Sequence, residues 1–303
     1  MQPSPQVRQR PLLALLVRLL AAAMISVMLT LVKLAGERGV SLVETIFWRQ
    51  LLPAVAIAGW LATRGQLGRL RTARFPAHAR RAAVGLLGLL LNLGVVLLLP
   101  LTESTVLGFT SPIFAVILAA LLLKERVGPT RWLAVVLGLA GVAIIAWPDR
   151  SALPLDGLTV GVGAAFMVAL ISIQIRDLSR TEDSLRIVFW FSALTAPAMA
   201  LPALLMGNPH DNQTWLILGG VALFGGIGQI LLTAALRIGS VSSVIVMDYS
   251  AFGWAMLWGW LLFDHLPPAA TWAGAPIIVA AGLIIVWREH RLHLAKPAAP
   301  LGS

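Results

Sequence analysis

The chain has 303 residues, of which 58% are hydrophobic and only 12% are charged, and it contains no cysteine. A soluble domain has about 25% charged residues, so this composition excludes an ordinary soluble protein and indicates one embedded in lipid. The lack of cysteine excludes a disulfide framework and thiolate catalysis. The formal net charge of +10 would suggest nucleic-acid binding in a soluble protein, so the positions of the basic residues decide its meaning.

Ten apolar stretches are long enough to cross a bilayer, whose hydrocarbon core of about 30 Å needs about 20 helical residues. None has the alternating pattern of an outer-membrane barrel strand, and helices are the other way to satisfy every backbone group in lipid. We therefore predict an all-α integral membrane protein with ten transmembrane helices. The predicted spans are about 12–35, 41–63, 81–100, 103–123, 129–147, 155–177, 184–206, 214–236, 240–263 and 268–287.

The basic residues sort to one side of these spans. Seventeen lie in loops and tails on the side of the N-terminus, whereas only Arg38 and Arg150 lie in loops on the other side. Arg81 is counted with the basic loop 64–81. Because positively charged loops stay in the cytoplasm, both termini are predicted to be cytoplasmic. The positive charge then reflects topology, and the basic loop lacks the interleaved aromatic residues of a nucleic-acid site.

The two halves of the chain repeat one another. Trp48 returns as Trp190, 142 residues later, and Trp132 returns as Trp272, 140 residues later. Each half carries five predicted spans, an odd number, so the second half enters the membrane from the opposite side. Inverted repeats of this kind are typical of transporters. The predicted division is a cytoplasmic tail 1–11, a first repeat 12–147, a second repeat 155–287 and a cytoplasmic tail 288–303.

The first half carries short motifs in a set order. They are Phe47-Trp48-Arg49 in the second span, Ser111-Pro112 in the fourth, and residues 122–126 leading into Trp132 and 138–141. Their order, spacing and partial duplication resemble the repeat of the drug/metabolite transporter superfamily, EamA type. The second copy departs from it, because Phe191 stands in place of Arg49 and Ala251 in place of Pro112.

The resemblance implies a carrier of the inner, cytoplasmic membrane that works by alternating access. Many members of this family export amino acids and other small metabolites, and an aromatic amino-acid exporter is one member that the resemblance suggests. The family places its substrate in a central cavity lined mainly by helices one, three, four, six, eight and nine.

Asp248 is the most informative single residue. It is predicted to lie about nine positions into the ninth span, where a carboxylate costs about 2.5 to 3.5 kcal/mol. Its counterpart in the first half is Phe109, so the architecture does not need an acid there. We predict that Asp248 binds a substrate amine or carries a proton. The alternative is a structural carboxylate, paired with a basic residue or capped by Ser243 or Ser250.

Aromatic residues surround this position in the sequence. Tyr249, the only tyrosine, and Phe252 follow Asp248, and Phe109 occupies the equivalent place in the first half. Such rings can wall an apolar or aromatic substrate, or they can pack against lipid and neighbouring helices.

Two basic residues lie inside predicted spans, and each has two possible roles. Arg49 is either a structural clamp, with Glu44 as its ion-pair partner, or a group that recognises a substrate carboxylate. Lys33 lies near the outer end of the first span, where its side chain can snorkel to the interface or guard the outer mouth as a gate.

Neutral polar residues mark the helices that the resemblance assigns to the cavity. Asn92, Gln174 and Gln229 lie in the third, sixth and eighth spans. Each either contacts substrate or bonds a neighbouring helix, which is worth about 0.6 kcal/mol on average in membranes. Pro112 cannot continue the helical hydrogen-bond ladder, so the fourth span is predicted to bend there, and Pro112 is the candidate hinge.

Enzyme chemistry has little support in the sequence. All five histidines fall in predicted loops or in the C-terminal tail, without metal-ligand spacing and without a partner acid in a helix, and no HExxH or GxSxG motif is present. We therefore expect no enzymatic activity, no metal and no cofactor. A channel is also disfavoured, because no filter sequence stands out.

These observations and the resemblance together predict a secondary transporter that exports or exchanges small metabolites, in particular amino acids including aromatic ones. A cationic-drug or quaternary-amine exporter is the alternative, for which an acid among aromatic rings would also serve. The expected partners are a small-molecule substrate, the lipid bilayer and protons, with no nucleic acid.

Overall fold

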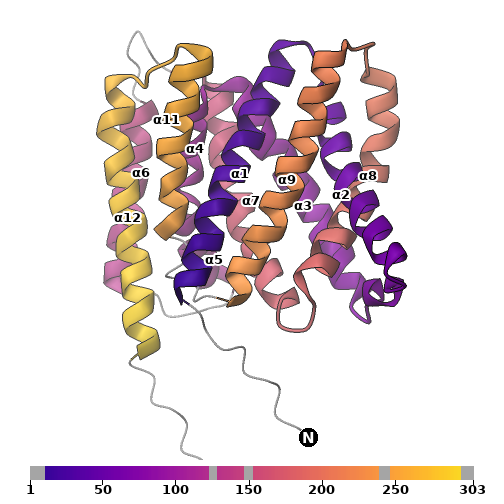
Figure 1. Ribbon diagram of the computed structural model, residues 1–303. Coiled ribbons are helices and arrows are strands. Elements are labelled where there is room, and N and C mark those ends of the chain that lie inside the picture. The colour runs from indigo at the N-terminus through magenta and orange to yellow at the C-terminus, as the bar shows by residue number, and fades with distance from the viewer. Residues whose placement is uncertain (1–10, 123–127, 147–152, 239–245, 295–303) are drawn as a thin grey trace, which may run out of the picture.

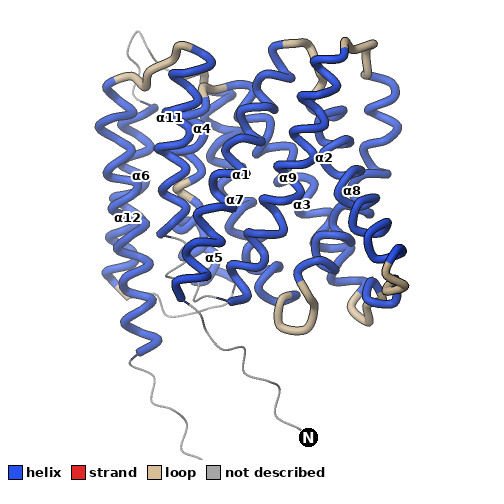
Figure 2. The backbone as a smooth tube through the Cα atoms, viewed as in Figure 1, coloured by secondary structure: helices blue, strands red, loops and turns tan. Residues whose placement is uncertain are grey.

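The structure, a computed structural model, describes residues 11–122, 128–146, 153–238 and 246–294. Within these ranges every regular element is a helix and no strand is present, as Figure 2 shows. The elements are α1 (Pro11–Glu37), α2 (Leu42–Thr63), η1 (Leu67–Leu70), α3 (Phe75–Leu98), α4 (Leu101–Gly108), α5 (Ser111–Leu122), α6 (Pro129–Ala146), α7 (Leu155–Leu178), α8 (Ser184–Met206), α9 (Asn212–Ile238), η2 (Val246–Tyr249), α11 (Ser250–Phe263) and α12 (Ala269–Leu294).

The apolar stretches of the sequence become the crossings of a membrane bundle. Among the described residues, eight helical stretches are long and apolar enough to span a bilayer, one of them being Leu101–Leu118 across α4 and α5. The shorter α6 and α11 supply the remaining two crossings, which confirms the predicted all-α fold of ten transmembrane segments. Leucines on the outside of the bundle are largely uncovered, with Leu204 81% and Leu216 77% exposed, as side chains that face lipid can be.

The helix contacts are related by exchange of the two halves. α1 packs along α9, and its counterpart α7 packs along α3, the counterpart of α9. Three further contacts join equivalent helices: α2 with α8, α4 with α11, and α6 with α12. The contact of α2 with α9 is matched by that of α8 with α3. Figure 1 shows α6 and α12 at one edge and α2 and α8 toward the other, with α1 and α9 between them. This is the arrangement that an inverted repeat requires.

Two equivalent crossings depart from a single continuous α-helix. The fourth is divided into α4 and α5 by Phe109 and Thr110, and Pro112 is the second residue of α5. A proline is tolerated in the first turn of a helix, where its missing N–H group has no partner to lose. The ninth crossing holds the 3₁₀ turn η2 before α11. Asp248 lies in this turn rather than deep in a continuous helix, and residues 239–245 lie outside the described residues.

Two helix boundaries differ from the predicted ones. α3 begins at Phe75, six residues before the predicted start of the third span, because Pro76 favours the first turn of a helix. α12 continues to Leu294, past the predicted end at residue 287. The earlier start of α3 has the larger consequence, since it places Arg81 inside a crossing.

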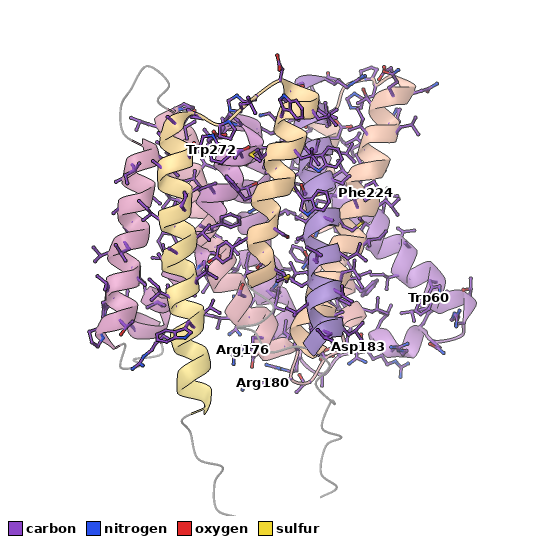
Figure 3. All side chains as sticks on the ribbon, turned by 60° about the vertical axis from the view of Figure 1, so that its left-hand side comes forward. Trp60, Arg176, Arg180, Asp183, Phe224 and Trp272 are labelled. Atoms are coloured by element: carbon purple, nitrogen blue, oxygen red, sulfur yellow. The ribbon has the colours of Figure 1, made fainter. Side chains whose placement is uncertain are left out.

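The two ends of the bundle carry different side chains. α1 begins and α12 ends at the same end (Figure 1). In Figure 3 Arg176, Arg180 and Asp183 lie toward that end, whereas Trp272, at the start of α12, lies toward the other. The basic end is the cytoplasmic one by the positive-inside rule.

Candidate functional site

Asp248 forms an ion pair with Arg18 that links the ninth crossing to α1. Nε of Arg18 donates to Oδ1 of Asp248, and Nη2 donates to Oδ2 at 2.5 Å, so the contact is bidentate. The hydroxyl of Ser250 does not cap the carboxylate, because it donates to the backbone oxygen of Met247. Ser243 lies outside the described residues. Of the two interpretations of Asp248, the structure thus shows the ion pair, and a role with substrate or protons stays a prediction.

The predicted substrate rings lie against one another where the two discontinuous crossings meet. Phe109 and Tyr249 form a T-shaped pair with centroids 5.0 Å apart, and Phe252 forms a second with Trp272 at 6.1 Å. The hydroxyl of Tyr249 points at Gly282 of α12, which has no side chain to block it. In this conformation the rings fill the space between the two broken crossings and α12.

Arg49 is buried in α2, and its described partners are all neutral. Nε lies 3.3 Å from Sδ of Met28, and Nη1 donates to Oε1 of Gln50 at 2.9 Å. Gln50 in turn donates to Oγ1 of Thr195 on α8 at 2.7 Å. The predicted ion pair with Glu44 is wrong, because residues five apart lie on different faces of a helix. Arg49 is thus a buried cation held by neutral groups.

Arg81 is a second buried arginine, and the sequence interpretation missed it. Its charge predicts a place in the cytoplasmic loop, but it lies in the second turn of α3 and is only 4% exposed. Its guanidinium carbon lies 4.2 Å from the centroid of Phe191 in a cation–π contact. Nε and Nη1 are buried and make no hydrogen bond with the described residues. Pro76 was the signal that could have moved the helix start and revealed this residue.

Three histidines lie beside glutamates, which corrects the prediction that no helix offers them an acid. The distances between Nε2 and the nearest carboxylate oxygen are 2.9 Å for His210–Glu44, 3.5 Å for His265–Glu103 and 3.8 Å for His78–Glu182. Glu44 lies in α2 and Glu103 in α4. The partners are far apart in sequence, 166 residues for the first pair, so no local spacing could reveal them.

Lys33 caps the C-terminal, outer end of α3 rather than reaching the membrane surface. Nζ donates to the backbone oxygens of Val96 and Leu99 at 3.2 and 2.9 Å, which lie at the C-terminal end of that helix. A cation is favourable there because the last carbonyls of a helix lack partners. A gating role for Lys33 stays a prediction.

Glu103 is a buried acid that the sequence interpretation did not single out. It is fully buried in α4, and Oε1 accepts from Oγ1 of Thr271 at 3.2 Å. It thereby ties α4 to α12 near the outer end of the bundle. Only the repeat comparison could have marked it from the sequence, because the equivalent stretch near residue 242 carries no acid.

The three neutral amides are dispersed over α3, α7 and α9, and within the described ranges no hydrogen bond joins one to another. Asn92 and Gln229 are half-buried. Oε1 of Gln174 is buried and has no hydrogen-bond partner among the described residues. Each amide therefore stays a candidate, and Gln174 has an unused acceptor inside the bundle.

The cytoplasmic loops of the two halves are joined by an ionic network. Thr72 donates to Oε1 of Glu182 at 2.6 Å, and Nη1 of Arg186 contacts Oε2 at 2.5 Å. Nη2 of Arg74 contacts Asp177 at 2.5 Å. Burial raises the pKa of Glu182, but the hydrogen bonds from Thr72 and Arg186 outweigh it and hold the pKa below its ordinary value of 4.5.

Comparison with known proteins gives consistent results along the whole bundle. Residues 12–147 and 155–287 each match the model of the EamA-like transporter family. A riboflavin transporter of Vibrio cholerae is 32% identical over 78% of this chain and 80% of its own length. A pseudopaline exporter of Pseudomonas aeruginosa is 31% identical over 88% of this chain and 93% of its own.

A solved crystal structure shares the fold, with a TM-score of 0.65 and 18% identity over 92% of this chain and 98% of the other. Both named relatives move a small molecule across a membrane, and this multi-pass bundle is likewise a non-enzymatic small-molecule transporter. The matches in both halves and the relatives above 30% identity show that the chain belongs to the EamA-like transporter family.

Proposed function

We propose that the protein is a secondary transporter of the cytoplasmic membrane that exports or exchanges small metabolites, amino acids including aromatic ones, by alternating access. The observation that carries the substrate class is Arg49, a buried cation with neutral partners only. A guanidinium group presents a planar fork of donors that matches a carboxylate. An amino acid supplies that carboxylate, and its side chain would lie in the apolar surroundings of Arg49.

Those surroundings suit an apolar or aromatic side chain. Met28, which contacts Arg49, belongs to a buried cluster that includes Phe191, with Phe224 packed against it. Aromatic rings and methionine adapt to flat apolar groups with little loss of side-chain entropy. This supports aromatic amino acids within the proposed class.

Alternating access is supported by the inverted arrangement of the halves. Transporters of this design place their substrate at the interface between repeats, near the bilayer midplane and beside discontinuous helices. Here α4 with α5, and η2 with α11, are such helices, and Pro112 at the start of α5 is the proposed hinge. The driving force is a gradient, either of the substrate itself or of protons moving in exchange.

The cationic-drug alternative is less well supported. It relied on Asp248 as a free acid among aromatic rings, but both oxygens of that carboxylate bind Arg18. A cationic substrate would have to break this bidentate contact and leave Arg18 without a partner, which is costly for a side chain only 11% exposed.

Uptake of labelled phenylalanine into proteoliposomes tests the proposal. We expect Arg49→Met to lower uptake at least about tenfold, whereas Arg80→Met, which removes an exposed charge from α3, leaves it unchanged. Unlabelled amino acids should compete, and a quaternary amine should not. Riboflavin belongs in the panel because one relative transports it. Competition by the quaternary amine alone would instead support the cationic alternative.

Retained folding is checked by size-exclusion chromatography and thermal unfolding of each variant before transport is measured. If the folded Arg49→Met variant transports phenylalanine as fast as the wild type, Arg49 does not recognise the carboxylate. If no amino acid is transported at all, the proposed substrate class is wrong.

A further inference from the structure

Arg81 extends its charge toward the middle of the membrane. In a helix a long side chain can run along the axis, and Nη1 of Arg81 lies beside Gly85, one turn further along α3, where a Cβ atom would collide with it. Gly85 is ten residues from the start of α3 at Phe75, which corresponds to about 15 Å of rise. Because α3 ends at Leu98, the guanidinium group lies near the middle of this crossing.

Arg49 is linked to the same stretch of α8 through a chain of hydrogen bonds. It bonds Gln50, which bonds Thr195, and Oγ1 of Thr195 donates to the backbone oxygen of Phe191 at 2.6 Å. Arg81 lies over the ring of that same Phe191. Both guanidinium groups are thus connected to one turn of α8, Arg81 directly through the ring of Phe191 and Arg49 through Gln50 and Thr195.

The positive charge of this pair is not neutralised by the described residues. No carboxylate lies within 4 Å of either guanidinium group among them, and the two arginines repel each other electrostatically. The nearby acids are engaged elsewhere, because Glu44 contacts His210 and Glu182 contacts Arg186. A cation–π contact offsets only a small part of the cost of burying an ionised group.

α7 adds a neutral amide at about the same height. α3 and α7 run in opposite directions, and Ile171 packs against Gly88. Gln174 lies three residues further along α7 from Ile171, so it is level with Gly85 on α3. Its Oε1 atom is buried without a partner. A carboxamide in this place can donate its N–H groups to an anionic oxygen.

We propose that Arg49 and Arg81 together bind one substrate through two anionic groups, so that the protein prefers small dianions, such as dicarboxylates, to monocarboxylates. This inference rests on the proposed function, because it uses Arg49 for the first carboxylate, and it adds Arg81 for the second. A dianion neutralises both guanidinium groups, whereas a monocarboxylate leaves one buried charge without a partner. The ring of Phe191 and the absence of a side chain at Gly85 hold the guanidinium group of Arg81 in this position.

Matched ligand pairs test the inference, with binding measured by thermal stabilisation and by competition with labelled phenylalanine in proteoliposomes. The pairs are aspartate with asparagine, glutamate with glutamine, and succinate with succinamate, each differing by one carboxylate replaced by an amide. We expect the member with two carboxylates to bind at least about tenfold more tightly to the wild type, since a site built for a charged group rejects its neutral isostere.

Arg81→Met is the decisive variant, and Arg80→Met on the same helix is its control. Arg81→Met should lose the preference for dicarboxylates and keep binding of monocarboxylates. Its ligand-free form should be as stable as the wild type or more so, because an unpaired buried charge has been replaced by an apolar side chain of similar length. Arg49→Met should lose both classes, and Arg80→Met should keep the wild-type preference.

The outcomes separate this inference from the proposed function. The inference is overturned if the wild type binds both members of each pair equally well. It is also overturned if the dicarboxylate preference survives in Arg81→Met. In either case, transport of monocarboxylates would leave the proposed function intact. A marked loss of stability in ligand-free Arg81→Met would show that Arg81 is a structural residue and overturns it as well. Failure to bind or move any carboxylate contradicts both.

Discussion

The ion pair between Arg18 and Asp248 predicts an asymmetric double-mutant cycle. In Asp248→Leu the guanidinium of Arg18, whose side chain is 11% exposed, keeps its charge and loses its partner, because arginine does not deprotonate in proteins. In Arg18→Met the carboxyl group of Asp248, 32% exposed, can bind water or take up a proton. Asp248→Leu is therefore expected to be the more destabilising single substitution.

The exposed fractions set the size of the effect. Removing one partner of a fully buried pair costs about 3 to 5 kcal/mol. Because this pair is only partly buried, we expect about 2 kcal/mol for Asp248→Leu and about 1 kcal/mol for Arg18→Met. For a chain of this size these free energies correspond to losses in apparent Tm of roughly 4 °C and 2 °C. The double variant should lie near the wild type, since apolar side chains then replace both charges.

The assay is thermal unfolding of the four proteins in one detergent and lipid mixture, with uptake measured in proteoliposomes. If the pair is a structural link between α1 and the ninth crossing, the double variant recovers both Tm and uptake. A double variant as unstable as the sum of the single variants would refute the energetic coupling. A double variant with wild-type Tm but no uptake would show that the pair acts in transport beyond stability, as the substrate or proton role predicted for Asp248 requires.

Two further predictions concern the loop network and the helix interfaces. Because the pKa of Glu182 is lowered in the folded protein, the carboxylate stabilises the fold fully at pH values above the ordinary pKa of 4.5. This stabilisation is lost as the pH falls through the lowered pKa of the folded state, so the Tm difference between wild type and Glu182→Gln should shrink in acid. A Cβ at Gly274 would lie 2.6 Å from the backbone oxygen of Gly141, so Gly274→Ala should lower the free energy of unfolding by about 1 to 3 kcal/mol. The control Gly253→Ala places its Cβ in open space and should not lower the Tm. Equal Tm values for the two alanine variants would contradict the close approach of α6 and α12.

The lengths and positions of the crossings could be predicted from the sequence because a bilayer constrains them directly. The predicted span 184–206 coincides with α8, because the thickness of the hydrocarbon core sets the length of a crossing. The interruption of the fourth crossing at Phe109 and Thr110 lies close to Pro112, the one local signal available. The ninth crossing has no proline, and only its equivalence to the fourth could have indicated a change of helix type at Asp248.

The candidate site was less predictable because its contacts join distant segments. Arg81 follows a run of loop arginines, so charge alone assigned it to the loop, and only the start of α3 at Phe75 places it in the membrane. The pairing of Arg18 with Asp248 spans 230 residues. No periodicity or spacing in the sequence reports such a contact, whereas the fold brings α1 beside the ninth crossing and makes it.

The repeat explains why Arg49 and Phe191 differ although they occupy equivalent positions. α2 and α8 are equivalent helices of the two repeats, and they pack against each other. Equivalent residues on them therefore belong to the same interface. Two arginines at these positions, together with Arg81, would gather three positive charges in lipid. Phenylalanine at position 191 instead offers a ring face to Arg81 at 4.2 Å, an arrangement that attracts a cation. Phenylalanine in place of arginine at position 191 therefore provides the ring against which Arg81 lies. It also leaves the buried cations of this region, Arg49 and Arg81, in the first repeat alone.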